Sequence, residues 1–280
     1  MISIIICSRK KKIDPLLSKN IKESIGSIPY EIVWIDNSSN CYSIFSAYNR
    51  GVSLSKYDNL CFMHEDIVFH TTNWGQIVVD RLSDQKIGVV GVVGTLYIDN
   101  YTTSWISSGI IRGNLIQFNK KEGKSTTFHH NEYSFLGENV ISVDGLWMCM
   151  RKSIFANDNI RWDDKLYKGF HFYDMDICLQ AISKGYVNLI AQDILIEHKS
   201  MGNKDSIYYE NCILFHNKWD YFLPQLTKKI PNDIVNEAKS NQLKGFCQMG
   251  TALYYAKKEL NKSSHQLVTY LYNHFNKLTK

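Results

Sequence analysis

The feature that most constrains the fold is an alternation, over residues 1–93, of short unbroken apolar runs with segments of helical periodicity. The apolar runs do not alternate with polar residues, which is typical of strands covered on both faces in a parallel sheet wrapped by helices. The sequence predicts strands at Ile2–Cys7, Glu31–Ile35, Asn59–Met63 and Ile87–Val93, and helices at Leu17–Ser27, Ser43–Leu54 and Trp74–Leu82.

Three of these strands end in polar or charged residues. They are Cys7, Ser8 and Arg9 after the first strand, Asp36 and Asn37 after the second, and His64, Glu65 and Asp66 after the third. Because ligands bind beyond the carboxyl ends of parallel strands, we expect these groups to meet at one edge of the sheet. A buried strand that ends in ionisable residues needs compensation of their charge by solvent, a salt-bridge partner or a metal ion.

The pattern after residue 93 is less regular. Glycine, threonine and asparagine predict loops and a hairpin near Ile110–Phe118, with its turn at the Gly-Asn pair 113–114. A strand-like run covers Asn139–Met150, and Tyr173–Lys184 has helical spacing. A further strand is predicted at Ile194–Glu197, and the pattern is helical from Ser206 onward.

Charge and cysteine content narrow the class of protein. Lys and Arg outnumber Asp and Glu by 32 to 27, an excess that suits a phosphorylated substrate or an anionic membrane surface. No zinc-finger or RNP-like spacing occurs, so we expect no nucleic-acid partner. The seven cysteines are never spaced as CxxC, which predicts a reducing compartment. Without a signal-like start or the roughly 18 to 20 apolar residues that cross a bilayer, we expect a cytoplasmic protein.

Ordered segments of the chain resemble those of family 2-type glycosyltransferases, which have the nucleotide-sugar-binding GT-A fold. They read ISIIICSR, EIVWIDNSS, SAYNRGVSLSKYDNLCFMHEDI, VDGLWMCMRKSIF and GFHFYDMDICLQAISKGY, the last followed by EHKSMG. The resemblance implies an α/β catalytic domain at 1–222, with a mixed, mostly parallel sheet flanked by helices. A helical C-terminal extension would then cover 223–280.

The resemblance implies a divalent cation, Mn²⁺ or Mg²⁺, beside the third strand. The family has a DxD motif there, whose last carboxylate binds the cation on the donor diphosphate; Asp66 matches that carboxylate and His64 replaces the first Asp. Imidazole suits Mn²⁺ better than Mg²⁺. His198 matches a family histidine that completes the metal site or contacts the diphosphate. The alternatives are a solvated strand end with a local His–carboxylate pair, and a packed or surface histidine at 198.

The same resemblance implies donor contacts along the strand ends. The residues concerned are Cys7, Ser8, Arg9, Asp36, Asn49, Arg50, Gly51, His64, Glu65, Asp66, Asp144 and Gly145. Asp36 would accept a hydrogen bond from the nucleobase, Gly51 would permit close backbone approach, and Arg50 would neutralise phosphate. An Asx turn at Asp36 and a helix-terminating glycine at Gly51 are the local alternatives.

The segment His171–Leu179 resembles the family's Glu-Asp-x-Asp-Leu segment, and the resemblance implies that Asp174 is the catalytic base of an inverting transferase. It would deprotonate the acceptor hydroxyl as that hydroxyl attacks the anomeric carbon opposite the leaving diphosphate. Asp176 is the second candidate, and the two cannot share one face of a helix, so one would catalyse while the other caps the helix or orients a neighbour. Trp105, Trp147 and His171 are candidate acceptor contacts, with burial in the core as the alternative.

The segment HQLVTYLYNHFNKLTK, residues 265–280, has apolar residues at helical spacing. It is interpreted as a helix packed on the core or on a second subunit of a homo-oligomer. The other interpretation is an interfacial helix that contacts the inner face of a membrane near lipid-linked acceptors.

The resemblance therefore implies an inverting glycosyltransferase that moves a sugar from a nucleotide-diphosphate donor, with a UDP-sugar favoured, to a glycan or lipid-linked acceptor in bacterial surface polysaccharide assembly. One alternative is a degenerate member that binds a nucleotide sugar without turnover, because His64, Tyr173 and Gln180 depart from the family pattern. A sugar nucleotidyltransferase ranks lower, since the basic segment 8–12 lacks the glycines of a triphosphate-binding loop.

Overall fold

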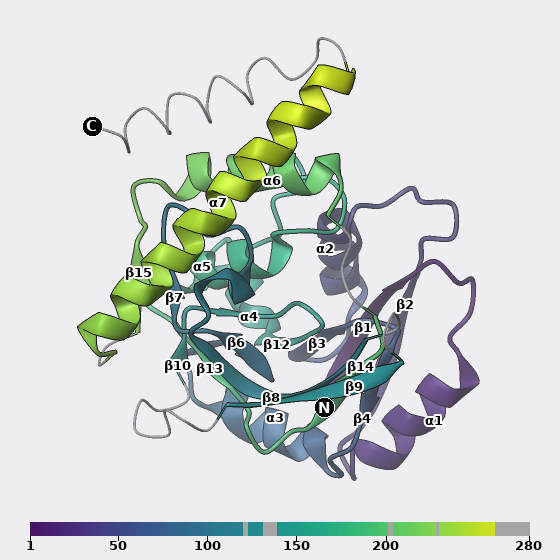
Figure 1. The fold of residues 1–280 in the computed structure, drawn as a ribbon. Helices are drawn as coiled ribbons and strands as arrows, with labels where there is room; N and C mark the ends of the chain where they lie inside the picture. Colours follow the sequence, from purple (N-terminus) through teal and green to yellow (C-terminus); the bar gives the residue numbers. More distant parts are fainter. Residues whose placement is uncertain (120–122, 131–138, 201–203, 228–229, 261–280) are drawn as a thin grey trace.

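The computed structural model describes residues 1–119, 123–130, 139–200, 204–227 and 230–260 (Figure 1). Its centre is a seven-stranded sheet with the strand order β10-β13-β5-β12-β3-β1-β2. The strands are β1 (Ile2–Ser8), β2 (Tyr30–Asp36), β3 (Asn59–Met63), β5 (Ile87–Gly91), β10 (Asn139–Val140), β12 (Trp147–Arg151) and β13 (Val187–Ile190). β1 is parallel to β2 and β3, and β5 to β13, whereas β10 and β12 run antiparallel to their neighbours. The mixed, mostly parallel sheet is confirmed.

A second, six-stranded sheet lies against the first and carries part of the site described below. Its strands are β4 (Ile67–Phe69), β6 (Val93–Thr95), β8 (Ile111–Asn119), β9 (Lys124–His130), β11 (Ser142–Val143) and β14 (Ile196–His198). A two-stranded pair joins β7 (Tyr97–Ile98) to β15 (Gln225–Leu226).

Helices cover both faces of the central sheet, as expected for strands with unbroken apolar runs (Figure 1). They are α1 (Pro15–Ser24), α2 (Ile44–Leu54), α3 (Trp74–Ser83), α4 (Lys152–Asn157), α5 (Tyr173–Ser183), α6 (Ser206–Trp219) and α7 (Asn232–Leu260), with a short 3₁₀ turn, η1 (Trp105–Ser108). Ile4 of β1 belongs to the apolar core that α1 and α3 cover, whereas its neighbour Ile5 belongs to the core formed with α2 and α5. One strand thus supplies two cores through alternate side chains.

Close approach of α2 to the sheet requires glycine at position 51. A Cβ there would overlap the Ile5 side chain of β1, and α2 continues past this residue to Leu54. Gly51 therefore neither ends the helix nor lies open to a ligand, and its predicted role beside the nucleotide is corrected to helix–sheet packing.

Three predicted elements differ from the structure. The run Ile87–Val93 divides into β5 and β6, which belong to different sheets, and Asn139–Met150 divides among β10, β11 and β12. The predicted turn at Gly113 is wrong: this residue lies inside β8, with φ +144°, where a Cβ would overlap the backbone around Val92. The glycine serves close strand contact, and β8 pairs with β9 in the register Asn119↔Lys124.

The helical pattern after residue 206 is present as α6 and α7. Residues beyond the predicted boundary at 222 belong to the apolar core formed with α2 and α5, and Ala238 and Phe246 of α7 are among its buried members. The division at residue 222 stays a prediction, and the predicted helix at 265–280 lies outside the described residues. Over the described part of the chain, no helix combines the length and apolarity needed to span a membrane.

Candidate active site

The carboxyl ends of the first three strands meet at one edge of the central sheet, as predicted. Ser8 at the end of β1 is in register with Asp36 at the end of β2, and Ile6 is in register with Met63 at the end of β3. The hydroxyl of Ser8 donates a hydrogen bond to the carboxylate of Glu65. This bond ties the segment after β3 to the end of β1.

A His–Asp–His cluster forms where β4 pairs with β14. The antiparallel register places His198 opposite Ile67, next to Asp66, and the Lys199 amide donates to the Asp66 carbonyl at 3.1 Å. His198 Nε2 lies 3.6 Å from Asp66 Oδ1 and 3.4 Å from His64 Nδ1. One ligand atom from each of the three side chains lies within 4.8 Å of the other two. A carboxylate and two imidazoles, separated by up to 134 positions in sequence, therefore converge.

Gln117 of β8 fixes which nitrogen of His198 faces the cluster. Its Nε2 donates to the carbonyls of His198 and Ser200 at 3.2 and 2.8 Å, so its Oε1 is the acceptor that lies 3.1 Å from His198 Nδ1. His198 therefore carries a proton on Nδ1. His198 Nε2 faces the carboxylate of Asp66. Both this nitrogen and the carboxylate oxygen are hydrogen-bond acceptors, so a proton or a cation has to lie between them.

Tyr173, the first residue of α5, holds His64 from the opposite side. Its hydroxyl lies 2.8 Å from His64 Nε2, and the His64 amide donates to the Leu146 carbonyl at 2.9 Å. A Cβ on Gly145 would overlap the Tyr173 ring and hydroxyl, so glycine is required for this approach. The Asp144–Leu146 turn and the start of α5 thus position His64 together.

The charge states of the cluster suit a cation. Burial opposes ionisation of Asp66, but hydrogen bonds with His198 and Ser200 outweigh it and hold the pKa of Asp66 far below its usual range. Burial and the neighbouring His198 lower the pKa of His64. For His198, burial acts against protonation, yet the hydrogen bond with Asp66 and the charge of Asp144 leave the pKa raised. A proton on His198 thus takes the position that a metal ion would take.

These three residues could hold a divalent metal ion. The donor set has two imidazole nitrogens and one carboxylate oxygen, and each imidazole has an outer hydrogen-bond partner, as metal-ligating histidines do. Nitrogen donors suit Mn²⁺ and related transition ions better than Mg²⁺, which prefers oxygen. The departure from DxD at His64 is therefore compatible with a metal site and shifts the preferred ion.

Asp174 lies in the first turn of α5 beside this cluster. The carboxylate accepts hydrogen bonds from the amides of Gly145 at 3.1 Å and Met175 at 2.9 Å. Burial, followed by the negative charge of Asp144, raises the pKa of Asp174 to about 7. The helix begins after Phe172, whose φ of +69° is uncommon for a residue other than glycine. Such backbone strain is typical of functional sites, and here it sets where Tyr173 and Asp174 enter the helix.

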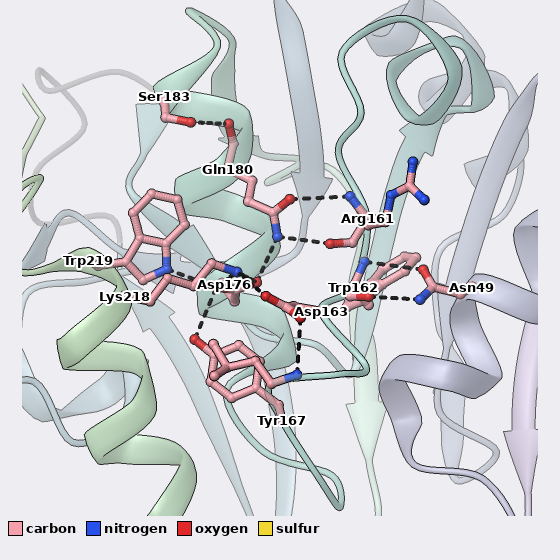
Figure 2. Close-up of polar contacts among 11 residues, drawn as sticks. Asn49, Arg161, Trp162, Asp163, Tyr167, Asp176, Gln180, Ser183, Lys218 and Trp219 are labelled. Carbon is pink, nitrogen blue, oxygen red and sulfur yellow. Dashed lines mark hydrogen bonds and ion pairs between the residues drawn. The ribbon is translucent and has the colours of Figure 1, made fainter.

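Asp176 is placed in a different environment (Figure 2). It is fully buried and binds Lys218 Nζ at 2.9 Å, Trp219 Nε1 at 2.8 Å, Gln180 Nε2 at 2.7 Å and the Tyr167 hydroxyl at 3.2 Å. Burial raises the pKa of Asp176, and the contacts with Lys218, Trp219 and Gln180 act in the opposite direction. All its acceptor capacity is used inside the protein, so it is corrected from a candidate base to the anchor of α5 on α6.

Of the predicted nucleotide contacts, Asp36 and Arg50 are exposed, whereas Asn49 is bonded within the protein. Asp36 is exposed at the sheet edge, where its Oδ1 accepts from the Ser38 amide at 2.9 Å in the Asx turn foreseen as the alternative, and this hydrogen bond lowers the pKa of Asp36. Both polar atoms of the Asn49 side chain are engaged within the protein: Nδ2 donates to the Trp162 carbonyl at 2.7 Å, and Oδ1 accepts from the Trp162 amide at 3.2 Å. Arg50 is exposed, with its guanidinium 5.9 Å from the Tyr42 ring.

The first strand end supplies one half-buried candidate, Cys7, and one exposed candidate, Arg9, besides Ser8. Burial raises the pKa of the Cys7 thiol to about 11, so the thiol stays protonated at neutral pH. Arg9 is exposed, and its guanidinium lies 5.8 Å from the ring of Phe170 in the segment that precedes α5. This places an exposed cation beside the strand edge.

The predicted acceptor contacts are corrected at Trp147. It is fully buried between Phe69 and Trp74, with ring centroids 6.4 and 6.1 Å away, so it is a core residue. Trp105 is half-buried in η1, where it packs against both cores. His171 is half-buried three residues before Asp174, with Tyr208 edge-on at 5.1 Å, and remains accessible.

Tyr173 and Gln117 contribute to the site but were missed by sequence reasoning. Tyr173 was noted only as a departure from the family pattern, although its place next to Asp174 was a signal. Gln117 gave no signal, because it meets His198 through the pairing of β8 with β14, in which these two residues are in register.

A family model described as "Glycosyltransferase like family" matches residues 4–218, more than three quarters of the chain. The chain belongs to this glycosyltransferase-like family. The sheet order, the family match and the structural likeness described next confirm the GT-A fold. No curated protein matches this glycosyltransferase-like chain.

A solved structure similar to this chain is the crystal structure of GalNAc-T7 with UDP, GalNAc and Mn²⁺. The TM-score is 0.52 at 12% sequence identity, and the match covers 93% of this chain and 58% of the other. At this identity the likeness shows the fold alone, and the chain spans little more than half the length of that neighbour.

Proposed function

We propose that the protein is an inverting glycosyltransferase that uses a nucleotide-diphosphate sugar, with a UDP-sugar favoured, and a glycan or lipid-linked acceptor. The observation that carries the proposal is that the candidate metal site and the candidate base meet at the start of α5. Tyr173 binds the metal-competent cluster through His64, and the next residue, Asp174, is a carboxyl group with a pKa near 7. A general base works best when its pKa is close to the working pH.

Each group has one task in this proposal. Asp66, His64 and His198 would hold a divalent cation, Mn²⁺ in preference to Mg²⁺, whose chemistry is to neutralise charge on the donor diphosphate. Asp36 and the end of β1 would hold the nucleoside. The Asp174 carboxylate would accept the proton of the acceptor hydroxyl as the new glycosidic bond forms and the bond to the diphosphate breaks. His171 is the accessible candidate for an acceptor contact.

The family membership and the GT-A fold support the transferase class. The GalNAc-T7 structure contains UDP and Mn²⁺, which supports the choice of donor and ion to test first. The proposed setting is the cytoplasm, in assembly of a bacterial surface polysaccharide, with the acceptor lipid-linked or a free glycan. The scattered cysteines and the family resemblance support that setting.

The test is release of the nucleotide from a panel of sugar donors with Mn²⁺, Mg²⁺ or EDTA: UDP-, GDP- and dTDP-sugars, which release a nucleoside diphosphate, and CMP-sugars, which release CMP. We expect turnover of one donor class with Mn²⁺ and none with EDTA. The anomeric configuration of the transferred sugar, measured by NMR, should be opposite to that of the donor. Retention of configuration would contradict the direct displacement, and tight donor binding without turnover would identify a non-catalytic binding protein.

A further inference from the structure

A large cavity lies on the side of the central sheet that α2 and α4 cover. Its volume is about 850 Å³, within the range of roughly 300 to 1,000 Å³ typical of small-molecule sites. The walls come from α2, α4, residues 159–165 and single residues of α5 and α6. None of its lining residues belongs to the His64–Asp66–His198 cluster, and Asn49 is its one member among the predicted donor contacts.

The floor of this cavity is aromatic and contains an unsatisfied donor. Phe155 of α4 is half-buried, and its ring centroid lies 5.4 Å from that of Trp162. Trp162 is fully buried, and within the described residues its indole Nε1 has no hydrogen-bond partner. This Nε1 is not accessible from the cavity, so the surface that the floor presents to a ligand is the half-buried ring of Phe155.

The rim carries an excess of positive charge. The charged lining residues are Lys152, Arg161, Lys165, Lys218, Asp163 and Asp164. Lys218 and Asp163 form an ion pair at 3.2 Å, which leaves three cations and one carboxylate, an excess of +2. Lys165 is exposed and forms no ion pair with any described residue. Charge complementarity therefore favours an anionic ligand.

The wall of the cavity is joined to the helix that carries Asp174. Gln180 and Lys218 line the cavity and also bind the buried carboxylate of Asp176 (Figure 2). Gln180 further binds the backbone of Arg161 on the rim, at 2.9 and 3.2 Å. A ligand on this rim would thus contact residues that hold α5 in place.

We infer that the cavity binds an acidic sugar unit of the acceptor glycan, outside the His64–Asp66–His198 cluster. The aromatic floor offers an apolar face to a sugar ring, Ser53 and Asn159 add a hydroxyl and an amide, and the cations on the rim meet a carboxylate. This inference rests on the proposed glycosyltransferase function, which supplies the reason for a glycan ligand.

The experiment measures binding by isothermal titration calorimetry without donor or metal, so it does not depend on turnover. The probes are a disaccharide containing a uronic acid, a neutral disaccharide and inorganic phosphate. Two variants change the cavity: Arg161→Ala combined with Lys165→Ala removes charge from exposed positions, and Ser53→Trp fills space while keeping every charge. The matched control is Lys19→Ala combined with Lys22→Ala on α1, on the opposite face of the sheet.

We expect the acidic disaccharide to bind the wild type and the α1 control equally. It should bind both cavity variants about tenfold more weakly, because two charge-assisted contacts or the space itself are lost. Unchanged binding to both cavity variants, equal binding of the neutral disaccharide, or phosphate binding as tightly as the disaccharide would each overturn the inference. If Ser53→Trp does not fold, the double charge variant decides.

The two proposals fail in distinguishable ways. Stabilisation of the same proteins by UDP-sugar and Mn²⁺ is measured in parallel by thermal unfolding. If the two cavity variants lose binding of the acidic disaccharide but are still stabilised by UDP-sugar and Mn²⁺, the acidic sugar binds in the cavity. Absence of UDP-sugar stabilisation in the wild type would contradict the proposed function, whatever the cavity binds.

Discussion

Asp174 and Asp176 are two positions apart on α5, and their carboxylates have different partners. Asp176 binds four side-chain donors in a closed network, whereas Asp174 accepts only backbone hydrogen bonds and keeps oxygen capacity for another proton donor. The sequence predicted that the two would take different roles, because residues two apart cannot share a helix face. The assignment between them needed the positions of Lys218 and Trp219, 42 and 43 residues away.

The raised pKa of Asp174 predicts the pH dependence of the reaction. The base acts as its ionised form, and this form becomes populated as the pH rises through about 7. We expect kcat/KM to increase with pH from 5.5 to 8 and to level off above the pKa of Asp174. Asp174→Asn should lower kcat by roughly 100-fold or more, as loss of a general base does. A profile that falls or stays flat over this range would contradict the assignment.

The buried ion pair at Asp176 predicts a stability effect. Lys218→Met would leave a fully buried carboxylate with three hydrogen bonds but no positive partner, and we expect the free energy of unfolding to fall by about 2–3 kcal/mol. Lys19→Met removes one partner of the exposed pair with Glu23 and is the control, with an expected change below about 0.5 kcal/mol. Urea unfolding measures both, and equal effects would show that the Asp176 pair adds nothing specific.

At the scale of elements, the local pattern of apolar residues predicted those strands and helices that lie within a single sheet or layer along their whole length. The predicted strand Asn59–Met63 coincides with β3, and the helix predicted at Tyr173–Lys184 matches α5 to within one residue. The prediction of one strand at Ile87–Val93 is wrong because every residue of β5 and β6 is buried. The apolar run therefore continues through the point where the chain leaves one sheet for the other. Periodicity reports burial and does not show which sheet supplies it.

The packing of α2 on β1 gives a test at this scale. Gly51→Ala would place a methyl group against Ile5, in a contact that the well-packed core can relieve only by moving the helix. We expect a loss of about 1–3 kcal/mol in the free energy of unfolding. Gly250→Ala in α7 has open space around its Cβ and should be neutral or stabilising by up to about 1 kcal/mol. Thermal and urea unfolding compare the two, and a neutral Gly51→Ala would show that α2 is not held closely against the sheet.

Across the whole molecule, the candidate site joins segments that are distant in sequence. Local pattern predicted that the ends of β1, β2 and β3 would meet, and the family resemblance pointed to His198. The neighbours that give these residues their chemistry came from the pairing of β14 with β4 and β8, and from the closeness of Gly145 to Tyr173. Such long-range pairings leave no local signal, so Gln117 could not be predicted.

The central claim is that one edge of the sheet holds the cation and the donor, while Asp174 acts only in the chemical step. The most direct measurement is thermal unfolding of the wild type, Asp66→Asn and Asp174→Asn with UDP-sugar and Mn²⁺, Mg²⁺ or EDTA. A ligand that binds the folded state raises the melting temperature by mass action.

We predict that the melting temperatures of the wild type and Asp174→Asn rise with UDP-sugar and Mn²⁺, rise less with Mg²⁺ and stay unchanged with EDTA. Asp66→Asn should lose the rise under every condition. A rise that persists in EDTA or in Asp66→Asn would contradict the metal-dependent donor site.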